Sequence, residues 1–219
     1  MSKTPSVPGT DRPADKAAGH WLLAQLGKIS MGRLKKGDLD TEGWTNLATL
    51  QGRIDSAPLF IDDSPNMTLM EIRAKCRRLK QRNDLKLVVL DYLQLMSSGK
   101  KVESRQQEVS EFSRSLKLLA KELDVPVIAL SQLNRGSEQR TDKRPMVSDL
   151  RESGSIEQDA DMVILLHRED MYNPDSDRVG EADMIIAKHR GGPTRTIPLA
   201  FSGKYSRFNN MANEAPPQY

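Results

Sequence analysis

Two short apolar runs separated by a long amphipathic stretch constrain the fold of this chain more strongly than any other feature. The first run, LVVL, covers residues 87–90, and the second, VIALS, covers residues 127–131. Apolar residues between the runs recur at intervals of three and four, which is the period of one helix face. These residues are Val109, Phe112, Leu116, Leu119 and Leu123. A strand, a helix and a strand in this order predict a βαβ unit, whose strands lie parallel with a right-handed crossover.

Further strands are predicted on both sides of this unit. Apolar runs at residues 162–167, 184–189 and 196–201 predict three strands after it, the last two joined by a glycine-rich turn. LFID, residues 59–62, predicts a short strand before it. The fold class is therefore α/β, with a mostly parallel sheet that is flanked by helices and ends in antiparallel C-terminal strands.

Composition limits the class of protein. The content of hydrophobic residues is 37%, which allows a buried core, and the net charge of +3 indicates a slightly basic chain. The single cysteine, Cys76, excludes an intrachain disulfide and is typical of a reducing compartment. No apolar run reaches the roughly 18 residues that a membrane span needs. We therefore expect a cytoplasmic protein that makes no membrane contact.

The chain divides by composition into three segments. Residues 1–19 are rich in proline, glycine and charge, and they predict a disordered or divergent leader. Residues 20–208 carry the predicted helices and strands and are expected to form the folded domain. Residues 209–219 are polar and contain proline, so we predict a flexible C-terminal tail.

A helix is predicted to begin after Thr68, because Thr68 and Glu71 have the spacing of a capping box. The face of this helix opposite its apolar residues is strongly basic. It carries Arg73, Lys75, Arg77, Arg78, Lys80 and Arg82. Two interpretations of the basic face remain open, a solvated surface and a contact with nucleic acid or another subunit.

Polar residues follow both strands of the βαβ unit. Asp91 comes directly after LVVL, and Gln132 follows VIALS. Because ligands of open α/β sheets bind beyond the carboxyl ends of the strands, both residues are expected at one ligand-binding edge. There a carboxylate can hold Mg²⁺ and an amide can contact a γ-phosphate or an attacking water. An aspartate after a strand is also common as a simple cap.

Several runs together resemble one family. LVVLDYLQLM, VPVIALSQLNRG, DLRESGSIEQDAD and EADMIIAKHRGGPT occur in this order. They resemble the RecA-like motor domain of bacterial DnaB-type replicative DNA helicases, over roughly residues 44–212. The resemblance implies a hexameric ring that hydrolyses ATP with Mg²⁺ at subunit interfaces and moves 5′ to 3′ on single-stranded DNA. It also implies a primase and a helicase loader as partners.

The resemblance assigns nucleotide-site roles to four residues. Asp91 matches the Walker B aspartate that supports Mg²⁺, and Gln132 matches the glutamine that couples the γ-phosphate to the DNA-binding loops. Lys188 and Arg190 match the basic pair that reaches the γ-phosphate of the neighbouring subunit. Without the resemblance, Lys188 and Arg190 would be read as solvated side chains.

The same resemblance implies a DNA-binding loop. Arg151, Glu152 and Gly154 match residues that contact the DNA backbone. The preceding stretch, residues 134–145, is basic and has no apolar residue to hold it, so it is expected to be mobile before DNA binds. No aromatic residues are interleaved with these basic ones, which favours phosphate contacts over base stacking.

The clearest departure of the sequence from the family concerns the phosphate-binding loop. The phosphate-binding motif G-x-x-x-x-G-K-[ST] does not occur in the sequence, and the nearest run is LLAQLGKIS, residues 22–30. We therefore expect a helicase fragment whose fold is incomplete on its N-terminal side, and we expect it to be poorly soluble. An inactive remnant that binds only DNA or helicase subunits is the alternative, and a RecA-type recombinase ranks below both.

Overall fold

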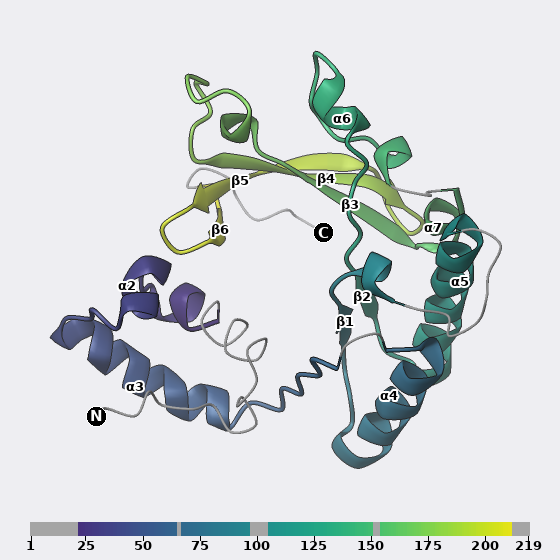
Figure 1. The fold of residues 1–219 in the computed structure, drawn as a ribbon, viewed down its shortest axis with the longest axis horizontal. Helices are drawn as coiled ribbons and strands as arrows, with labels where there is room; N and C mark the ends of the chain where they lie inside the picture. The colour runs from purple at the N-terminus through teal and green to yellow at the C-terminus, as the bar shows by residue number, and fades with distance from the viewer. Residues whose placement is uncertain (1–21, 65–66, 97–104, 151–153, 212–219) are drawn as a thin grey trace. The chain divides into compact units, whose positions relative to one another are not determined.

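A computed structural model describes residues 22–64, 67–96, 105–150 and 154–211 of the chain. The chain forms two compact units (Figure 1). The first contains the described residues up to Asp63, the segment Asp175–Ala182 and the residues from Pro198 onward. The second contains Ser64–Pro174 and Asp183–Ile197. The predicted leader, residues 1–19, lies outside the described residues.

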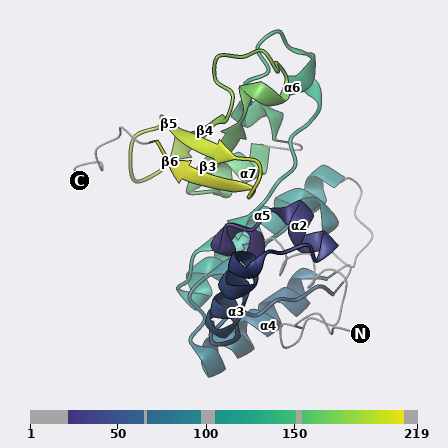
Figure 2. The same ribbon diagram turned by 90° about the vertical axis from the view of Figure 1, so that its left-hand side faces the viewer.

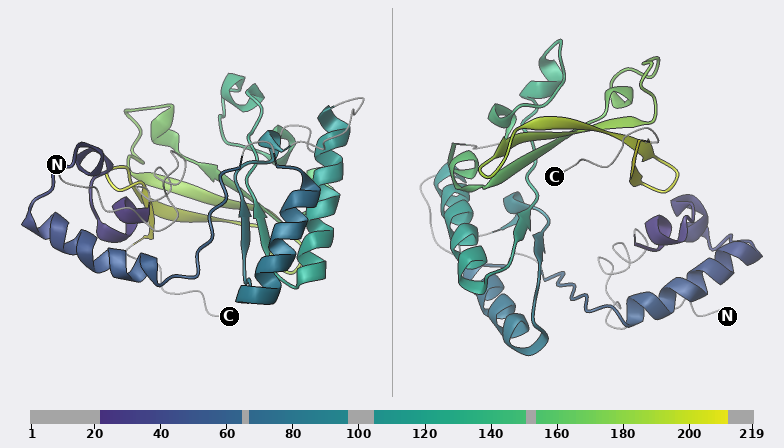
Figure 3. Two further views of the ribbon diagram at one scale, coloured as in Figure 1. Left: turned by 60° about the horizontal axis from the view of Figure 1, so that its bottom comes forward. Right: turned by 180° about the vertical axis from the view of Figure 1, so that it is seen from behind.

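The predicted βαβ unit is confirmed in the second unit. Strands β1 (Val88–Leu90) and β2 (Val127–Ala129) pair in parallel, with Val88 opposite Val127. Helix α5 (Arg105–Leu123) connects them, and α4 (Leu69–Asn83) precedes β1. Both helices run beside the strand pair in Figure 3. The strands are shorter than the apolar runs that predicted them, although the flanking residues Pro126 and Leu130 still share backbone hydrogen bonds with β1.

Helix α4 begins as its sequence predicts. The Thr68 hydroxyl accepts a hydrogen bond from the Glu71 N–H at 3.3 Å, and the Glu71 carboxylate accepts one from the Thr68 N–H at 2.8 Å. On the basic face of α4, Arg73 and Arg77 both pair with Glu122 of α5. Part of this basic face therefore joins the two helices.

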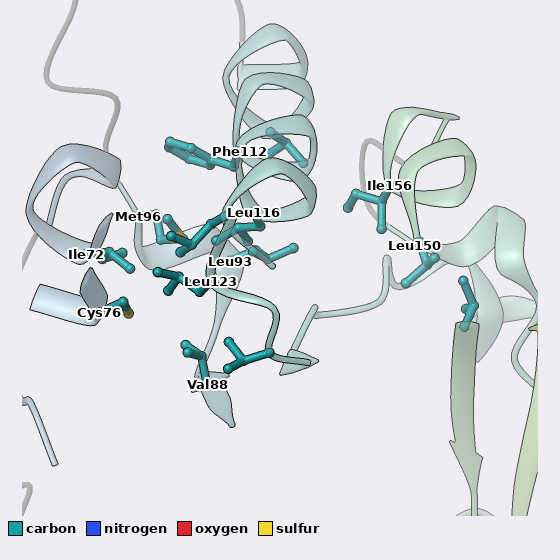
Figure 4. Packing of buried hydrophobic residues seen from close by; sticks show 14 of the residues in the cluster. Ile72, Cys76, Val88, Leu93, Met96, Phe112, Leu116, Leu123, Leu150 and Ile156 are labelled. Atoms are coloured by element: carbon teal, nitrogen blue, oxygen red, sulfur yellow. The ribbon is translucent and has the colours of Figure 1, made fainter. Parts of the chain in front are cut away.

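The core of the second unit lies between α4, α5 and the strands. Val109 and Phe112 of α5 are fully buried, and Ile72 and Cys76 of α4 pack toward them (Figure 4). Each Å² of apolar surface that is buried on folding contributes about 25 cal/mol, so this cluster is the main source of stability of the second unit. Cys76 is a free, buried thiol whose pKa is raised by burial.

The predicted antiparallel strands are also confirmed (Figure 2). They form a sheet of order β3-β4-β5-β6. Their bounds are Met162–His167, Glu181–His189, Arg195–Ser202 and Arg207–Asn210. Strand β6 was not predicted, since the run RFNN is largely polar, and its last two residues fall in the segment predicted to be a flexible tail. Residues 212–219 lie outside the described part of the chain.

Helical segments form the N-terminal part of the first unit. A helical segment at residues 22–27 precedes α2 (Met31–Lys36) and α3 (Thr41–Asp55). Asp40 caps α3 by accepting a hydrogen bond from the Gly43 N–H at 2.8 Å. The Gln25 side chain donates to the Ser206 carbonyl at 3.0 Å, which ties the first helical segment to the β5–β6 turn.

The prediction of a strand at residues 59–62 is wrong. This segment has no regular secondary structure, and Leu59, Phe60 and Ile61 are exposed. A strand requires a partner for its backbone groups, and none of the described strands pairs with this segment. Apolar residues alone were therefore insufficient to make it a strand.

The face of the β1–β2 pair opposite the core is also apolar. It carries Leu87, Val89, Ile128 and Leu130, all of which are exposed. Parallel strands are usually buried on both faces, so this surface is unusual for a sheet of this type.

Among the described residues, no helix has the length and apolar character needed to cross a membrane.

Short helical turns complete the second unit. They are η1 (Leu93–Leu95), α6 (Gly136–Gln139), η2 (Val147–Asp149), α7 (Gly154–Asp159) and η3 (Glu169–Met171).

Candidate functional site

Asp91 and Gln132 lie just beyond the ends of β1 and β2, as the sequence predicts. The segments that follow the two strands stay hydrogen-bonded to each other. The Leu130 N–H donates to the Leu90 carbonyl and the Leu93 N–H donates to the Leu130 carbonyl, both at 2.9 Å. The side chains of Asp91 and Gln132 are exposed. This edge of the sheet therefore offers a carboxylate and an amide to a ligand.

Gln94 joins the two strand ends. Its Nε2 donates to Ser131 Oγ at 3.0 Å and to the Gln132 carbonyl at 3.5 Å. Its Oε1 accepts a hydrogen bond from the Gln132 N–H at 3.2 Å. Sequence reasoning missed Gln94, although a polar residue three positions after Asp91, in a turn that follows a strand, is a usable signal.

The donor set suits the Mg²⁺ of a nucleotide better than a metal ion held by protein alone. No group of three or more His, Cys, Asp or Glu side chains in the described ranges is arranged to hold a metal ion. Mg²⁺ keeps several waters and commonly binds one carboxylate together with phosphate oxygens. A single exposed carboxylate, Asp91, fits that arrangement.

Lys188 and Arg190 lie together at the end of β4 and contact the C-terminal end of α7. Lys188 Nζ donates to the carbonyls of Glu157 and Gln158, the latter at 3.3 Å. Arg190 Nη2 donates to the Gln158 carbonyl at 2.7 Å. Cations are favoured at this end of a helix because its last carbonyls have no partner within the helix. The pair is thus held side by side at the surface.

A third cation lies next to this pair. Lys117 of α5 pairs with Asp161, and Arg190 Nη1 lies 3.6 Å from the other carboxylate oxygen of Asp161. The hydrogen bond from Lys117 lowers the pKa of Asp161, and the charges of Arg190 and Lys188 act in the same direction. Neither Lys117 nor Asp161 was predicted, because the fold brings them together from separate elements.

Of the three predicted DNA-contacting residues, only Gly154 is described, and it begins α7. Arg151 and Glu152 lie outside the described residues. Helix α7 is fixed to α5, because Ser110 and Ser155 share a hydrogen bond at 2.7 Å and Ile156 is buried. The structure therefore fixes the position of the helix that begins at Gly154, the last of the three predicted DNA-binding residues.

The basic stretch at residues 134–145 is held by ion pairs, which corrects the expectation that nothing holds it. Arg140 makes two hydrogen bonds of 2.7 Å to the buried carboxylate of Asp149. Arg144 donates to the buried carboxylate of Asp183 at 2.7 Å. The Arg140 hydrogen bonds lower the pKa of Asp149. Buried acids from elsewhere in the sequence take the place of the apolar residues that the stretch lacks.

Asp149 also connects the Gln132 segment to the chain before Arg151. Its carbonyl accepts a hydrogen bond from the Asn134 N–H at 2.7 Å, and Leu133 pairs with Leu150 as an antiparallel bridge. Backbone hydrogen bonds thus lead from the β2 end to the residue before the predicted DNA-binding loop.

One aromatic side chain lies beside the basic stretch. Lys143 Nζ is 5.0 Å from the centre of the Tyr172 ring, and the His167 ring stacks against Tyr172 at 6.2 Å. Burial lowers the pKa of His167, and the charge of Arg144 lowers it further. The sequence around Lys143 contains no aromatic residue, and Tyr172 comes from the β3–β4 connection.

Comparison with known proteins gives consistent matches. Residues 13–210 match the family described as DnaB-like helicase C terminal domain. The replicative DNA helicase DnaB of Leifsonia xyli is 69% identical over 191 residues, which are 87% of this chain and 42% of that protein. The replicative DNA helicase DnaC of Bacillus subtilis is 51% identical over 191 residues, again 87% of this chain and 42% of that protein. This chain thus spans less than half the length of these relatives.

Solved structures match over most of the chain. A solved ATPase domain superposes with a TM-score of 0.85 at 41% identity, covering 92% of this chain and 72% of that chain. A DnaB-like replicative helicase, solved in a study of its interactions with primase, superposes with a TM-score of 0.85 at 40% identity, covering 93% and 49%. The fold is therefore RecA-like, and the chain belongs to the family of DnaB-like helicase C-terminal domains.

Proposed function

We propose that this chain is part of the motor of a DnaB-type replicative helicase, in which ATP hydrolysis drives 5′-to-3′ movement on single-stranded DNA. The family match over residues 13–210 supports this assignment. The observation that carries it is the side chain of Gln94, which joins the ends of β1 and β2 and so fixes Gln132 relative to Asp91. A site in which the presence of a phosphate alters the position of a DNA-binding loop needs such a fixed arrangement.

Asp91 and Gln132 act on the nucleotide in this proposal. Asp91 would hold Mg²⁺ through its water shell, and the ion would supply positive charge to neutralise the phosphates of ATP. Gln132 donates its amide to the terminal phosphate or orients the attacking water. The bond from Asn134 to Asp149 then links a displacement of Gln132 to the chain that precedes Arg151. The segment from Gln132 to Asp149 is held by the hydrogen bonds of Gln94 and of Asn134.

Lys188 and Arg190 act on the nucleotide of a neighbouring subunit in a homo-hexameric ring. Cations placed in advance against a developing phosphate charge lower the barrier to phosphoryl transfer. Both side chains lie at the surface, and their partners are mainly backbone carbonyls, which a phosphate can replace. Hydrolysis in this arrangement depends on assembly of the ring.

Single-stranded DNA is the proposed macromolecular substrate. Arg151 donates to a phosphate, the backbone at Gly154 allows close approach to a phosphate, and Glu152 positions the loop. Because contacts to phosphate carry no sequence information, binding is expected to be independent of sequence and sensitive to salt. A primase and a helicase loader are further proposed partners, assigned by family.

A binding-only role is the second candidate. The absence of G-x-x-x-x-G-K-[ST] from the 219 residues favours it, because that loop supplies most contacts to the phosphates. In this case the chain would bind DNA or helicase subunits and would not hydrolyse ATP by itself. A MgATP titration separates the two, since binding tighter than roughly millimolar supports the enzyme and its absence supports the binding-only role.

Fluorescence anisotropy with an oligo(dT) strand tests the DNA-binding part of the proposal. The unaltered chain should bind with an affinity that falls as salt is raised. Arg151→Ala should weaken binding and reduce the slope of log affinity against log salt by about 0.7, the value for one phosphate contact on a single strand. Arg53→Ala removes the same charge from an exposed position on α3 and should leave the affinity unchanged. Equal affinities for the two variants would contradict the assignment.

A further inference from the structure

Four charged side chains from three elements converge next to the C-terminal end of α7. Lys117 comes from α5, Asp161 precedes β3, and Lys188 and Arg190 lie at and just after the end of β4. One oxygen of Asp161 faces Lys117 and the other faces Arg190. We call these four residues the Asp161 cluster.

The cluster carries more positive than negative charge. Its three cations and one carboxylate sum to +2 at neutral pH, because the lowered pKa of Asp161 keeps it ionised. The side chain of Asp161 is 62% exposed, so its ion pairs are screened by water and are weak. A more highly charged anion that approaches from solvent can therefore replace the carboxylate between the cations.

The position of Asp161 indicates what such an anion would be. A carboxylate held between an ammonium and a guanidinium occupies the place that a phosphate oxygen takes in sites for phosphorylated ligands. Lys117 lies on helix α5, Lys188 lies on strand β4, and Arg190 directly follows that strand. The backbone positions of the three cations are therefore fixed before any ligand binds. The arrangement suits a chain of phosphates, since three cations can contact more than one phosphate group.

We propose that Lys117 is a third phosphate-binding cation beside Lys188 and Arg190, and that Asp161 is an internal counter-ion which the terminal phosphates of a nucleotide displace. This inference rests on the proposed function, in which Lys188 and Arg190 meet a neighbouring subunit's nucleotide, and it adds two residues to that site. The competing view is that the pair formed by Lys117 and Asp161 only fastens α5 to the sheet.

Binding of inorganic tripolyphosphate to the full 219-residue chain, measured by titration calorimetry at low salt, tests the inference. This probe has no base or sugar and therefore reports only phosphate contacts. Lys117→Gln should weaken binding roughly three- to tenfold, as expected for the loss of one partly screened charge contact. Lys121→Gln, a matched loss of an exposed lysine one turn further along α5, should leave binding unchanged.

Asp161→Asn provides a test of opposite sign. Removal of the counter-ion should strengthen tripolyphosphate binding by a similar factor. If Asp161 only fastens α5 to the sheet, its replacement should instead weaken tripolyphosphate binding. Lys117→Arg keeps the charge and should restore most of the binding that Lys117→Gln loses. If Lys117→Gln does not fold, the comparison of Asp161→Asn and Lys117→Arg with the unaltered chain decides the matter.

The outcomes separate this inference from the proposed function. If Lys188→Gln and Arg190→Gln weaken binding while Lys117→Gln behaves like Lys121→Gln, the inference is overturned and the roles of the basic pair stand. If replacement of Lys188 and Arg190 has no effect, the basic pair itself is not a phosphate site and both ideas fail. A lack of any binding by the unaltered chain at millimolar tripolyphosphate also overturns the inference.

Discussion

The side-chain amide of Gln94 contacts the backbone of Gln132 on both sides of the residue, accepting from its N–H at 3.2 Å and approaching its carbonyl at 3.5 Å. Gln94 follows β1 and Gln132 follows β2, so this contact fixes the two strand ends of the βαβ unit against each other. In the proposed function, this contact holds Gln132 relative to the end of β1, which Asp91 follows.

Replacement of Gln94 tests the contact directly. Gln94→Leu removes the acceptor for the Gln132 N–H, so amide hydrogen exchange at Gln132 should become roughly fivefold to tenfold faster, corresponding to about 1 kcal/mol. Gln94→Glu keeps the acceptor oxygen and should retain most of the protection. Equal exchange rates at Gln132 in Gln94→Leu and the unaltered chain would show that the contact does not hold this segment.

The ion pair of Arg140 and Asp149 should contribute strongly to stability. Asp149→Asn leaves Arg140 without its charged partner and is expected to lower the free energy of unfolding by about 1–3 kcal/mol. Thermal or urea unfolding measures the loss. Asp84→Asn removes the same charge at an exposed helix end with left-handed backbone, which asparagine accepts, and should change stability little. Similar losses in both variants would contradict the role of the pair.

The lowered pKa of Asp149 predicts a dependence of this stability on pH. Since the folded-state pKa lies below the ordinary aspartate value of about 3.9, the stabilisation is fully present above that value and is lost as pH falls through the folded-state pKa. The difference in unfolding free energy between the unaltered chain and Asp149→Asn should be constant above about pH 5 and shrink below about pH 4. A difference that stays constant down to about pH 3 would be inconsistent with this origin.

The exposed apolar face of the β1–β2 pair predicts self-association of the isolated chain. Val89 and Ile128 lie opposite each other on this face, with exposed fractions of 56% and 51%. Exposed apolar strands readily contact other chains. Val89→Lys and Ile128→Lys should therefore raise the concentration at which light scattering detects aggregates. Met70→Lys changes an exposed apolar residue on α4 and should have a smaller effect; equal effects would place the contact elsewhere.

The sequence predicted the elements whose pattern is local. Apolar runs located β3, β4 and β5, the capping box and the three-and-four spacing of apolar residues located α4 and α5, and the βαβ order predicted the parallel pairing. The short strand at residues 59–62 failed because apolar character does not supply a pairing partner. Strand β6 was missed because its polar residues pair through their backbone with β5.

The position of a candidate site residue was predicted where the residue closely follows an apolar strand in the sequence, as at Asp91 and Gln132. It was missed where residues far apart in the sequence converge. Asp161 and Lys117 are separated by 44 positions, and Arg144 and Asp183 by 39. A basic stretch reads as a solvated segment in the sequence, since nothing local indicates the buried acids that hold it. Such partners follow from the tertiary fold alone.

The central claim is that Lys188 and Arg190 of this chain serve the nucleotide of a neighbouring subunit in a DnaB-type ring. The most direct measurement uses the Leifsonia xyli relative with alanine at its two matching positions, which should lose ATP hydrolysis. Addition of this chain should restore hydrolysis, and addition of the chain with Lys188→Ala and Arg190→Ala should not. No restoration by the unaltered chain, or equal restoration by both chains, would contradict the account.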